Sequence, residues 1–520
     1  MNEETFERVS MVVIALLCYA ATPLLFQNDA FYSITIGEWI VSHGVDMKDH
    51  FSMHDLPYTY PHWAFDVFIY VLYAVGSFTG IYIATVCLAI ALGLLLYTIN
   101  REISGNSIVA LFVTVFVIFV LYGGFITARA QLVSYILLLL TVYFIEKYLR
   151  TGMLYFPIFL FLIAVVIANT HAAVFPFFFI LFLPYICSVV VSTRCSDFYG
   201  SKQQVYTARV ILSNNYLTKY LAVTAVICLA AGLITPIGNT PYLYLYKTLA
   251  GTSLRNIIEH SPMVLILSPK TMIILLAFIL IIILLEVKIR LCDLFMLAGL
   301  FLMALAHQRH LSLLAVIGAP IFARMFGDYL KKAPETDIYL DKIFLKPKAL
   351  TVMAVVFTVM FVTMRANFRI FPYNGRITAN YNFLIKPTID ETSYPVAACD
   401  YIKNNLNLDT VRLFNEYDNG SYLMFRGLPV FVDSRADLYT LPFNGTDDVL
   451  QEYFDVTRIR KFYDETFEKY SITHLLIKCA SPLTVILARD IRYRELFWDD
   501  NFVLYSRNAE PPEETTTTTP

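Results

Sequence analysis

The feature that most constrains this chain is a series of long apolar runs that fills its first 365 residues. Crossing the hydrocarbon core of a bilayer as a helix takes about 20 apolar residues. Runs that approach this length recur at 11–26, 80–98, 107–123, 131–146, 154–170, 174–193, 217–235, 264–286, 290–306, 310–327 and 348–364. The sequence therefore predicts a polytopic α-helical membrane protein with about eleven transmembrane helices.

The overall composition agrees with a membrane protein and excludes other classes. Hydrophobic residues make up 58% of the 520 residues and charged residues 15%, against about 45–50% and about 25% in soluble domains. A soluble enzyme, a disordered chain and a fibrous protein are excluded. The 39 basic and 41 acidic residues nearly cancel, so no nucleic-acid partner is expected.

Basic residues predict the orientation of the spans, because cytoplasmic loops are enriched in Lys and Arg. The basic loops are marked by Arg194, Lys202, Arg209, Lys331, Lys332, Lys342 and Lys346, and by Lys147, Arg150, Lys288 and Arg290. These loops and the N-terminus are all cytoplasmic only if the ambiguous stretch 63–77 does not cross. We therefore expect 63–77 to form an interfacial or half-inserted helix. Residues 27–79 then form one long extracytoplasmic loop of a transmembrane domain, 1–365.

The region 366–508 has the pattern of a small α/β domain, which the topology places outside the membrane. VRLFNEY, LPVFVDSR and THLLIKCA are expected strands, and a helix is expected after Tyr394-Pro395. Polar residues at strand ends can form a ligand site or a buried Asp–Arg pair, and both readings stay open for Asn415, Asp433, Arg435 and Asp437. We expect the domain to bind an acceptor or to cover the membrane cavity. Residues 509–520 are expected to be a disordered tail.

The cysteines do not form a disulfide framework. Cys18, Cys87, Cys187, Cys228 and Cys292 lie in apolar runs and are typical of small core residues. Cys399 and Cys479 share the polar C-terminal region, where a disulfide is open if that region is extracytoplasmic.

Ionisable residues from different loops are expected at one membrane face, where such residues are costly and are functional candidates. Part of the set is also explained by a snorkelling interface. Asp29 stands out, since it lies three residues past an apolar span. A partly desolvated carboxylate there would have a raised pKa and could act as a base. For the other carboxylates and histidines of the first loop, a solvated loop with ordinary helix caps is the better explanation.

An ordered set of local patterns resembles the GT-C superfamily of integral membrane glycosyltransferases, and in particular a widespread bacterial subgroup. The pieces are NDAFYSITIGEWIVSHG, DHFSMHD, PHWAFDVFIYVLYAVGSFTG, TARAQLVSYI, ANTHAA, ITPIGNTPYLYLYKT, IIEHSP and HQRHLSLL, then YPVAACDYI, RLFNEYDNGSYLMF and VFVDSRADLY. The resemblance covers nearly the whole chain in order.

This resemblance implies transfer of a sugar from a polyprenyl-phosphate-linked donor at the outer membrane face. The implied acceptor is a glycan, lipid or protein in cell-envelope glycan biosynthesis. In the family a carboxylate of the first outer loop is the catalytic base, and Asp29 matches that position. Arg129, Arg309, His310 and Arg255 are the candidates for the donor phosphate. Candidates for orienting the acceptor are Glu259, His260, His171, Asp49 and His62.

The sequence also departs from better-known members, and other functions stay open. The first outer loop has no DxD and no adjacent acidic pair, and the Trp-Trp-Asp signature of oligosaccharyltransferases is absent, so protein N-glycosylation is not supported. No cofactor is implied. A divalent cation stays open because His and Asp residues are dense in the first outer loop, although no tight ligand spacing of the HExxH kind occurs. The alternatives are a flippase or transporter of lipid-linked sugar, which predicts an inverted repeat that the sequence does not show, and a non-enzymatic envelope scaffold.

Overall fold

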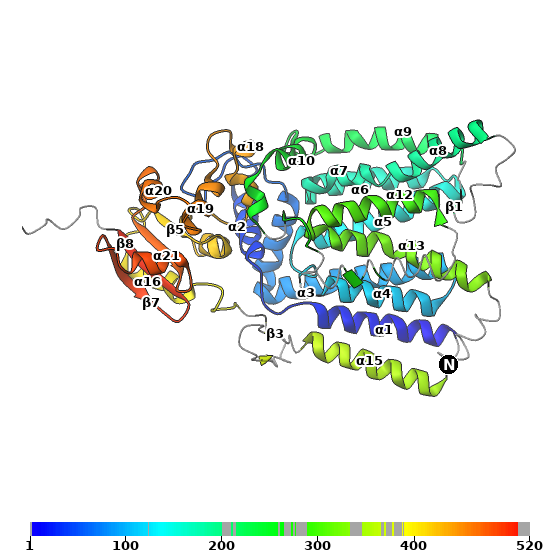
Figure 1. Cartoon of the computed structure of the whole chain (residues 1–520), viewed down its shortest axis with the longest axis horizontal. Coiled ribbons are helices and arrows are strands. Elements are labelled where there is room, and N and C mark those ends of the chain that lie inside the picture. Colours follow the sequence, from blue (N-terminus) through cyan, green and yellow to red (C-terminus); the bar gives the residue numbers. More distant parts are fainter. Residues whose placement is uncertain are drawn as a thin grey trace, which may run out of the picture. The chain divides into compact units, whose positions relative to one another are not determined.

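The computed structural model of the chain consists of two compact units (Figure 1). It describes residues 3–122, 124–199, 210–211, 215–257, 260–264, 272–273, 276, 289–332, 346–365, 369–370, 377–378, 387 and 389–507. The helical unit comprises Met1–Leu24, Gly76–Tyr242 and Ile257–Pro387. The sheet unit comprises Leu25–Val75, Leu243–Asn256 and Thr388–Pro520. Most of the long first loop therefore folds with the C-terminal region.

The helical unit consists of apolar helices that lie side by side (Figure 1). Its helices are α1 (Glu3–Ala21), the later part of α3 (Trp63–Ser104), α4 (Ser107–Leu121), α5 (Ala130–Thr151), α6 (Tyr155–Thr170), η1 (Ala172–Val174), α7 (Phe175–Ile180), α8 (Leu183–Tyr199), α9 (Thr218–Leu229), η3 (Ala230–Leu233), α12 (Leu291–Ala306), η7 (Gln308–His310), α13 (Leu311–Lys332) and α15 (Pro347–Arg365). Short strands β1 (Val210–Ile211) and β2 (Ile289–Arg290) pair in parallel, and β3 (Arg369–Ile370) and β4 (Ile377–Thr378) pair antiparallel.

Length and composition identify membrane-crossing candidates among the described residues. Four helical segments are long and apolar enough, namely Trp63–Ser104, Ala130–Thr151, Ala172–Arg194 and Gln308–Lys331. Five shorter apolar helices accompany them: Ser107–Leu121, Tyr155–Thr170, Thr218–Leu233, Leu291–Ala306 and Ala349–Arg365. A membrane protein is therefore supported, whereas the predicted span 264–286 lies mostly outside the described residues.

The helix α3 contains a break that separates its two parts. Ser77 has φ 52° and ψ −152°, so the helical hydrogen-bond pattern is interrupted there. A positive φ at a residue other than glycine is sterically unfavourable. The boundary between the two units falls at the same place, between Val75 and Gly76. The part of α3 before the break is the stretch 63–77. The distribution of basic residues predicted that this stretch does not cross the membrane.

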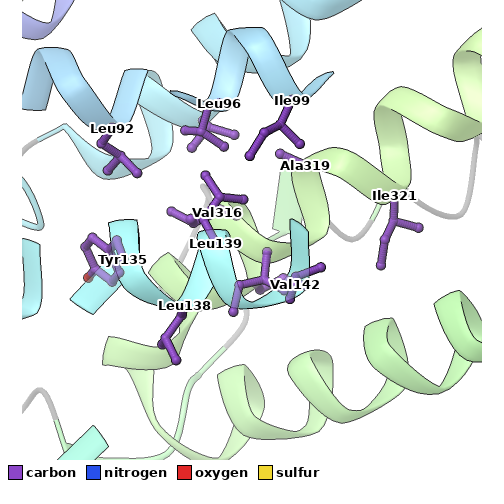
Figure 2. Close-up of a cluster of buried hydrophobic side chains, with 14 of the residues drawn as sticks. Leu92, Leu96, Ile99, Tyr135, Leu138, Leu139, Val142, Val316, Ala319 and Ile321 are labelled. Carbon is purple, nitrogen blue, oxygen red and sulfur yellow. The ribbon is translucent and has the colours of Figure 1, made fainter. Parts of the chain in front are cut away.

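Close packing of α3, α5 and α13 forms the interior of the helical unit (Figure 2). Leu96 of α3, Leu139 of α5 and Val316 of α13 are each fully buried. A Cβ at Gly327 of α13 would lie 2.4 Å from the carbonyl oxygen of Ser104. Only glycine therefore lets α13 approach the end of α3 so closely.

A network of four charged side chains lies inside the helical unit. The Arg290 guanidinium donates to Glu146 at 2.6 and 3.0 Å and to Asp293 at 2.6 and 2.8 Å. Arg324 pairs with Asp293 at 3.2 Å and with Glu146 at 3.3 Å. The Tyr185 hydroxyl donates to Glu146 at 3.0 Å. The network joins α5, α8, α12 and α13, and its two positive and two negative charges cancel.

The sheet unit is built around a four-stranded sheet with the order β5-β6-β8-β7. The strands are β5 (Leu413–Asn415), β6 (His474–Lys478), β7 (Tyr493–Trp498) and β8 (Phe502–Arg507). β5 and β6 are parallel, with Leu413 opposite His474, and the other two pairs are antiparallel. The helices of the unit are α2 (Asn28–His43), the early part of α3, most of α10 (Thr240–Ala250), η4 (Ser253–Asn256), α16 (Val396–Asn405), η8 (Tyr417–Asn419), α17 (Gly420–Phe425), η9 (Ala436–Tyr439), α18 (Leu441–Asn444), α19 (Val449–Thr457), α20 (Tyr463–Lys469) and α21 (Pro482–Leu487).

One of the three expected strands is not a strand. β5 lies in VRLFNEY and β6 in THLLIKCA, but LPVFVDSR forms only an isolated bridge, in which Val430 pairs with Ser52. The side chain of Asn415 explains the difference. Its oxygen accepts from the backbone N–H of Phe431 at 2.8 Å, and its amide donates to the carbonyl of Val432 at 2.7 Å. A side chain therefore takes the hydrogen bonds that a neighbouring strand would make.

The first loop is bound to the C-terminal region by backbone and aromatic contacts. Met53 N–H donates to the Val430 carbonyl at 3.0 Å, and His54 Nε2 lies 2.8 Å from the Phe431 carbonyl. The Phe31 ring of α2 packs edge-on against Tyr394, with ring centroids 5.0 Å apart. The loop and the C-terminal region thus fold as a single unit.

The strongest link between these segments is a buried ion triad. Arg435 Nη1 lies 2.7 Å from Asp49 and Arg435 Nη2 lies 2.6 Å from Asp433, and the exposed fractions of these side chains are 0–2%. The Tyr439 hydroxyl also donates to Asp433, at 2.6 Å. Of the two readings of the strand-end residues, this geometry supports the buried Asp–Arg pair.

The thiols of Cys399 and Cys479 do not form a disulfide. Both are free, with Cys399 buried in α16 and Cys479 exposed.

Replacing Arg435 with alanine should unfold the sheet unit far more easily than a matched surface change. Removing the cation leaves the carboxylates of Asp49 and Asp433 buried without compensation, which costs about 3–5 kcal/mol. Lys461→Ala is the control, because Lys461 and its partner Glu465 are 36% and 66% exposed, and an exposed pair contributes less than about 1 kcal/mol. Thermal unfolding of both purified variants measures the difference, and equal losses would show that the triad does not hold the unit together.

Candidate functional site

Cationic and imidazole side chains gather at one end of three helices of the helical unit. Arg129 is the N-cap residue of α5. His307 is the C-cap residue of α12, and Arg309 and His310 lie in η7, immediately before α13. His260 lies in the segment 260–264. We call these five residues the cation cluster.

Hydrogen bonds connect the segment around His260 to the turn between α12 and α13. His307 Nδ1 lies 2.7 Å from the His260 carbonyl oxygen, and Arg309 Nη1 lies 3.1 Å from His260 Nε2. Gln308 Nε2 donates to the Ser261 hydroxyl at 3.2 Å. The N–H of Met263 donates to the Leu305 carbonyl at 3.0 Å. Residues far apart in the chain are therefore held at fixed positions.

The electrostatic environment keeps His260 neutral. Burial lowers its pKa from 6.5 to about 3, and the positive charges of Arg309 and Arg129 add to this effect. Because a guanidinium only donates, Nε2 of His260 accepts from Arg309 and the ring proton resides on Nδ1. His260 therefore orients Arg309 and can donate one hydrogen bond, without adding a charge.

An apolar cavity adjoins the cation cluster. Its lining residues come from α5, α7, α8, α12 and α13: Leu138, Phe177, Ile180, Leu181, Pro184, Phe295, Met296, Gly299, Leu300, Met303, Leu313 and Ile317. His310 contacts two of them, since its ring lies 5.5 Å from the Phe177 ring and its Nδ1 lies 3.2 Å from the Met303 carbonyl. Two guanidinium groups with neighbouring imidazole donors, beside an apolar cavity, have the chemistry to bind an amphipathic anion.

Asp29 lies in the sheet unit, in the first turn of α2. Its side chain is half-buried. The N-terminal end of a helix favours a negative charge. The preceding residue, Asn28, donates from its side chain to the Tyr417 carbonyl at 3.1 Å. This contact fixes the start of α2, and with it Asp29, against the C-terminal region.

The other candidates are divided between the two units. His171 ends α6, and its Nδ1 lies 2.7 Å from the Ser134 hydroxyl on the first turn of α5, close in sequence to Arg129. His62 and Arg255 lie in the sheet unit, where His62 Nδ1 is 3.4 Å from the Tyr32 hydroxyl. Asp49 anchors the first loop through Arg435. Glu259 lies outside the described residues.

Sequence reasoning did not predict the burial of Asp66. Asp66 is fully buried, whereas His62 is half-buried although the Asp66 N–H donates to the His62 carbonyl at 2.9 Å. The cause is the close packing of α2 on α3, where a Cβ at Gly37 would lie 2.1 Å from the Asp66 carbonyl oxygen. The glycine in SITIGEW is the one sequence signal of this contact.

Metal binding receives no support from the described part of the chain. No group of three or more His, Cys, Asp or Glu side chains there could hold a metal ion.

The neutral state of His260 predicts its titration. Its resonances in an NMR spectrum of specifically labelled protein should not move between pH 5 and pH 8, because the folded pKa is about 3. The folded state binds fewer protons than the unfolded state below pH 6.5, so this group's stabilising contribution is lost as pH falls from 6.5 towards 3. His260→Gln, which cannot be protonated, assigns the resonance. A titration midpoint near 6.5 would contradict the geometry.

Comparisons with known proteins identify the fold. No protein-family model matches the sequence, and no curated protein matches it. Among solved structures, the chain resembles ArnT from Cupriavidus metallidurans, whose crystal structure has undecaprenyl phosphate bound. The TM-score is 0.52 at 11% sequence identity, over 98% of this chain and 99% of ArnT. The chain therefore has an ArnT-like fold along nearly its whole length.

Proposed function

We propose that this chain is a GT-C-type membrane glycosyltransferase, which transfers a sugar from a polyprenyl-phosphate-linked donor to an extracytoplasmic acceptor in cell-envelope glycan synthesis. The observation that carries the proposal is the cation cluster beside an apolar cavity. It occurs in a chain with the fold of ArnT, which binds undecaprenyl phosphate. A lipid phosphate combines an anionic head with an apolar tail, and the two features match its two parts.

The cation cluster would hold the phosphate of the donor. Arg129 and Arg309 suit this role because a planar guanidinium can donate two hydrogen bonds to one phosphate. As the bond between the anomeric carbon and the phosphate oxygen breaks, negative charge grows on the phosphate. Donors that are already positioned stabilise that charge without reorganising. His310 and the neutral His260 would add hydrogen bonds, and the part of the polyprenyl chain next to the phosphate would lie against the apolar lining of the cavity.

Asp29 would act as the general base. Its carboxylate would take the proton of an acceptor hydroxyl while that oxygen attacks the anomeric carbon and the lipid phosphate leaves. His171, His62 and Glu259 would orient the acceptor, with Arg255 as a further phosphate contact. In the topology that we propose, the N-terminus is cytoplasmic and the sheet unit is extracytoplasmic.

Replacing Asp29 with asparagine should abolish sugar transfer while donor binding persists. Asparagine keeps the shape and removes the base, and loss of a general base costs about 10²–10⁴-fold in rate. Asp55→Asn is the matched control, since Asp55 is an exposed carboxylate of the same loop. The measurement is transfer from a panel of radiolabelled polyprenyl-phosphate sugars into envelope extract, with the protein in lipid.

Each outcome of that assay is informative. Transfer by the wild type and by the Asp29→Asn variant at equal rates would remove Asp29 from the mechanism. Binding of the lipid-linked sugar without transfer by either protein would favour a flippase.

Replacing Arg309 with glutamine should raise the KM for the donor about tenfold or more, because a charge-assisted contact to phosphate is worth about 1.5–3 kcal/mol. Arg150→Gln is the control, since Arg150 lies in the last turn of α5 and is 49% exposed. Kinetics with varied donor concentration measure the change. An unchanged KM in the Arg309 variant would contradict the proposed phosphate site.

A further inference from the structure

One buried cation of the helical unit, Arg365, has no acidic partner among the described residues. Arg365 is the last residue of α15, and it is only 7% exposed. Its Nη1 donates to the Tyr82 hydroxyl at 3.1 Å and its Nη2 donates to the Tyr19 hydroxyl at 3.2 Å. The guanidinium carbon also lies 4.6 Å from the centre of the Tyr19 ring. No carboxylate in the described part of the chain forms an ion pair with it.

The surroundings of the Arg365 guanidinium compensate its buried charge only in part. Burial of a charge is costly unless a counter-ion compensates it. Cation–π contact and two hydroxyl groups compensate it only in part. A role at the helix end alone does not explain the burial either, because a cation can stabilise a helix C-terminus while exposed to solvent.

The groups around Arg365 supply more hydrogen-bond donors than acceptors. A guanidinium has five N–H donors and no acceptor. The two tyrosine hydroxyls accept from it and also hydrogen-bond to each other, so one hydroxyl proton remains available for donation. An anion with several acceptor oxygens is the chemistry that such a set recognises, and phosphate is the common biological example.

The expected depth of Arg365 in the membrane indicates that the phosphate belongs to a lipid. α15 has 19 residues and is therefore about 28 Å long, at 1.5 Å per residue. This is close to the thickness of the hydrocarbon core, about 30 Å. A helix of that length that crosses the bilayer has its last residue at the level of the lipid phosphates. Tyr19 likewise lies at the end of α1, which packs along α15 (Figure 1).

We propose that Arg365, Tyr19 and Tyr82 form a binding site for the phosphate group of a membrane lipid. The site is built from α1, α3 and α15, none of which carries a member of the cation cluster. The half-buried Tyr19 places it at the surface of the helical unit. The proposal does not depend on glycosyl transfer, so the activity assays and the test below fail or succeed separately.

The test measures lipid binding and lipid-dependent stability of the full chain in neutral detergent. Phosphatidylglycerol, undecaprenyl phosphate and diacylglycerol are titrated, with native mass spectrometry to count bound lipids and thermal unfolding to follow stability. Diacylglycerol has no phosphate and is the control ligand. Arg150→Gln is the control variant, because Arg150 is exposed at the end of α5. The two phosphate-bearing lipids distinguish a bilayer phospholipid from a polyprenyl phosphate as the natural ligand.

We expect Arg365→Gln to weaken binding of at least one phosphate-bearing lipid about tenfold, the scale of a lost charge-assisted contact. The affinity of Arg365→Lys should fall between that of Arg365→Gln and that of the wild type. Lysine keeps the positive charge but cannot donate two parallel hydrogen bonds from a planar group. Tyr82→Phe should weaken binding about fivefold, the scale of one hydrogen bond. The phosphate-bearing lipid should raise the Tm of the wild type more than that of Arg365→Gln, since a ligand stabilises the state that binds it.

Two results would overturn the proposal. One is equal binding of both phosphate-bearing lipids by the wild type, Arg365→Gln and Tyr82→Phe. The other is a loss of stability in Arg365→Gln that is the same with and without lipid, which is the signature of a purely structural residue. If Arg365→Gln does not fold, the Arg365→Lys and Tyr82→Phe variants decide the matter by the same two criteria.

Discussion

The guanidinium of Arg435 is the point on which the sheet unit depends. It lies between the carboxylates of Asp49 and Asp433 with almost no exposure to solvent, and such a group is tolerated only when its partners stay in place. Asp49 belongs to the first loop, and the loop therefore keeps its conformation only while the C-terminal region is folded. Because Asp29 lies in the first turn of α2, within the same loop as Asp49, the geometry of the proposed base depends on Asp433 and Arg435, far along the chain.

Features that depend on contacts between distant residues could not be predicted from the sequence, whereas local features could. The apolar runs predicted the helices because burial of a helix in lipid needs only local composition and length. The start of α16 after Tyr394-Pro395 was likewise local, and the structure confirms it. The ion pair between Asp49 and Arg435 was not predictable, since nothing near either residue specifies the other. LPVFVDSR was predicted wrongly because the competing hydrogen bonds come from the side chain of Asn415.

In the candidate site, too, the sequence predicted the residue types but not the contacts between distant segments. Arg129, Arg309 and His310 were chosen for their charge at expected span ends, and the structure gathers them around His260. Their convergence rests on hydrogen bonds between the segment around Ser261 and the turn around Gln308, which no periodicity reveals. The neutral state of His260 also follows only from the assembled cluster, because an isolated imidazole would titrate near pH 6.5. The burial of Asp66 was not predictable either, because it depends on α2, the helix that covers it.

The central claim is that the cation cluster binds the phosphate of a lipid-linked donor. The most direct measurement is an electron cryo-microscopy structure of the full chain in a lipid nanodisc with undecaprenyl phosphate added. The account predicts phosphate density within hydrogen-bond distance of Arg309 and Arg129, with the polyprenyl chain entering the cavity lined by Phe177 and Met303. Density for the phosphate elsewhere in the molecule, with the cation cluster unoccupied at saturating ligand, would contradict the account.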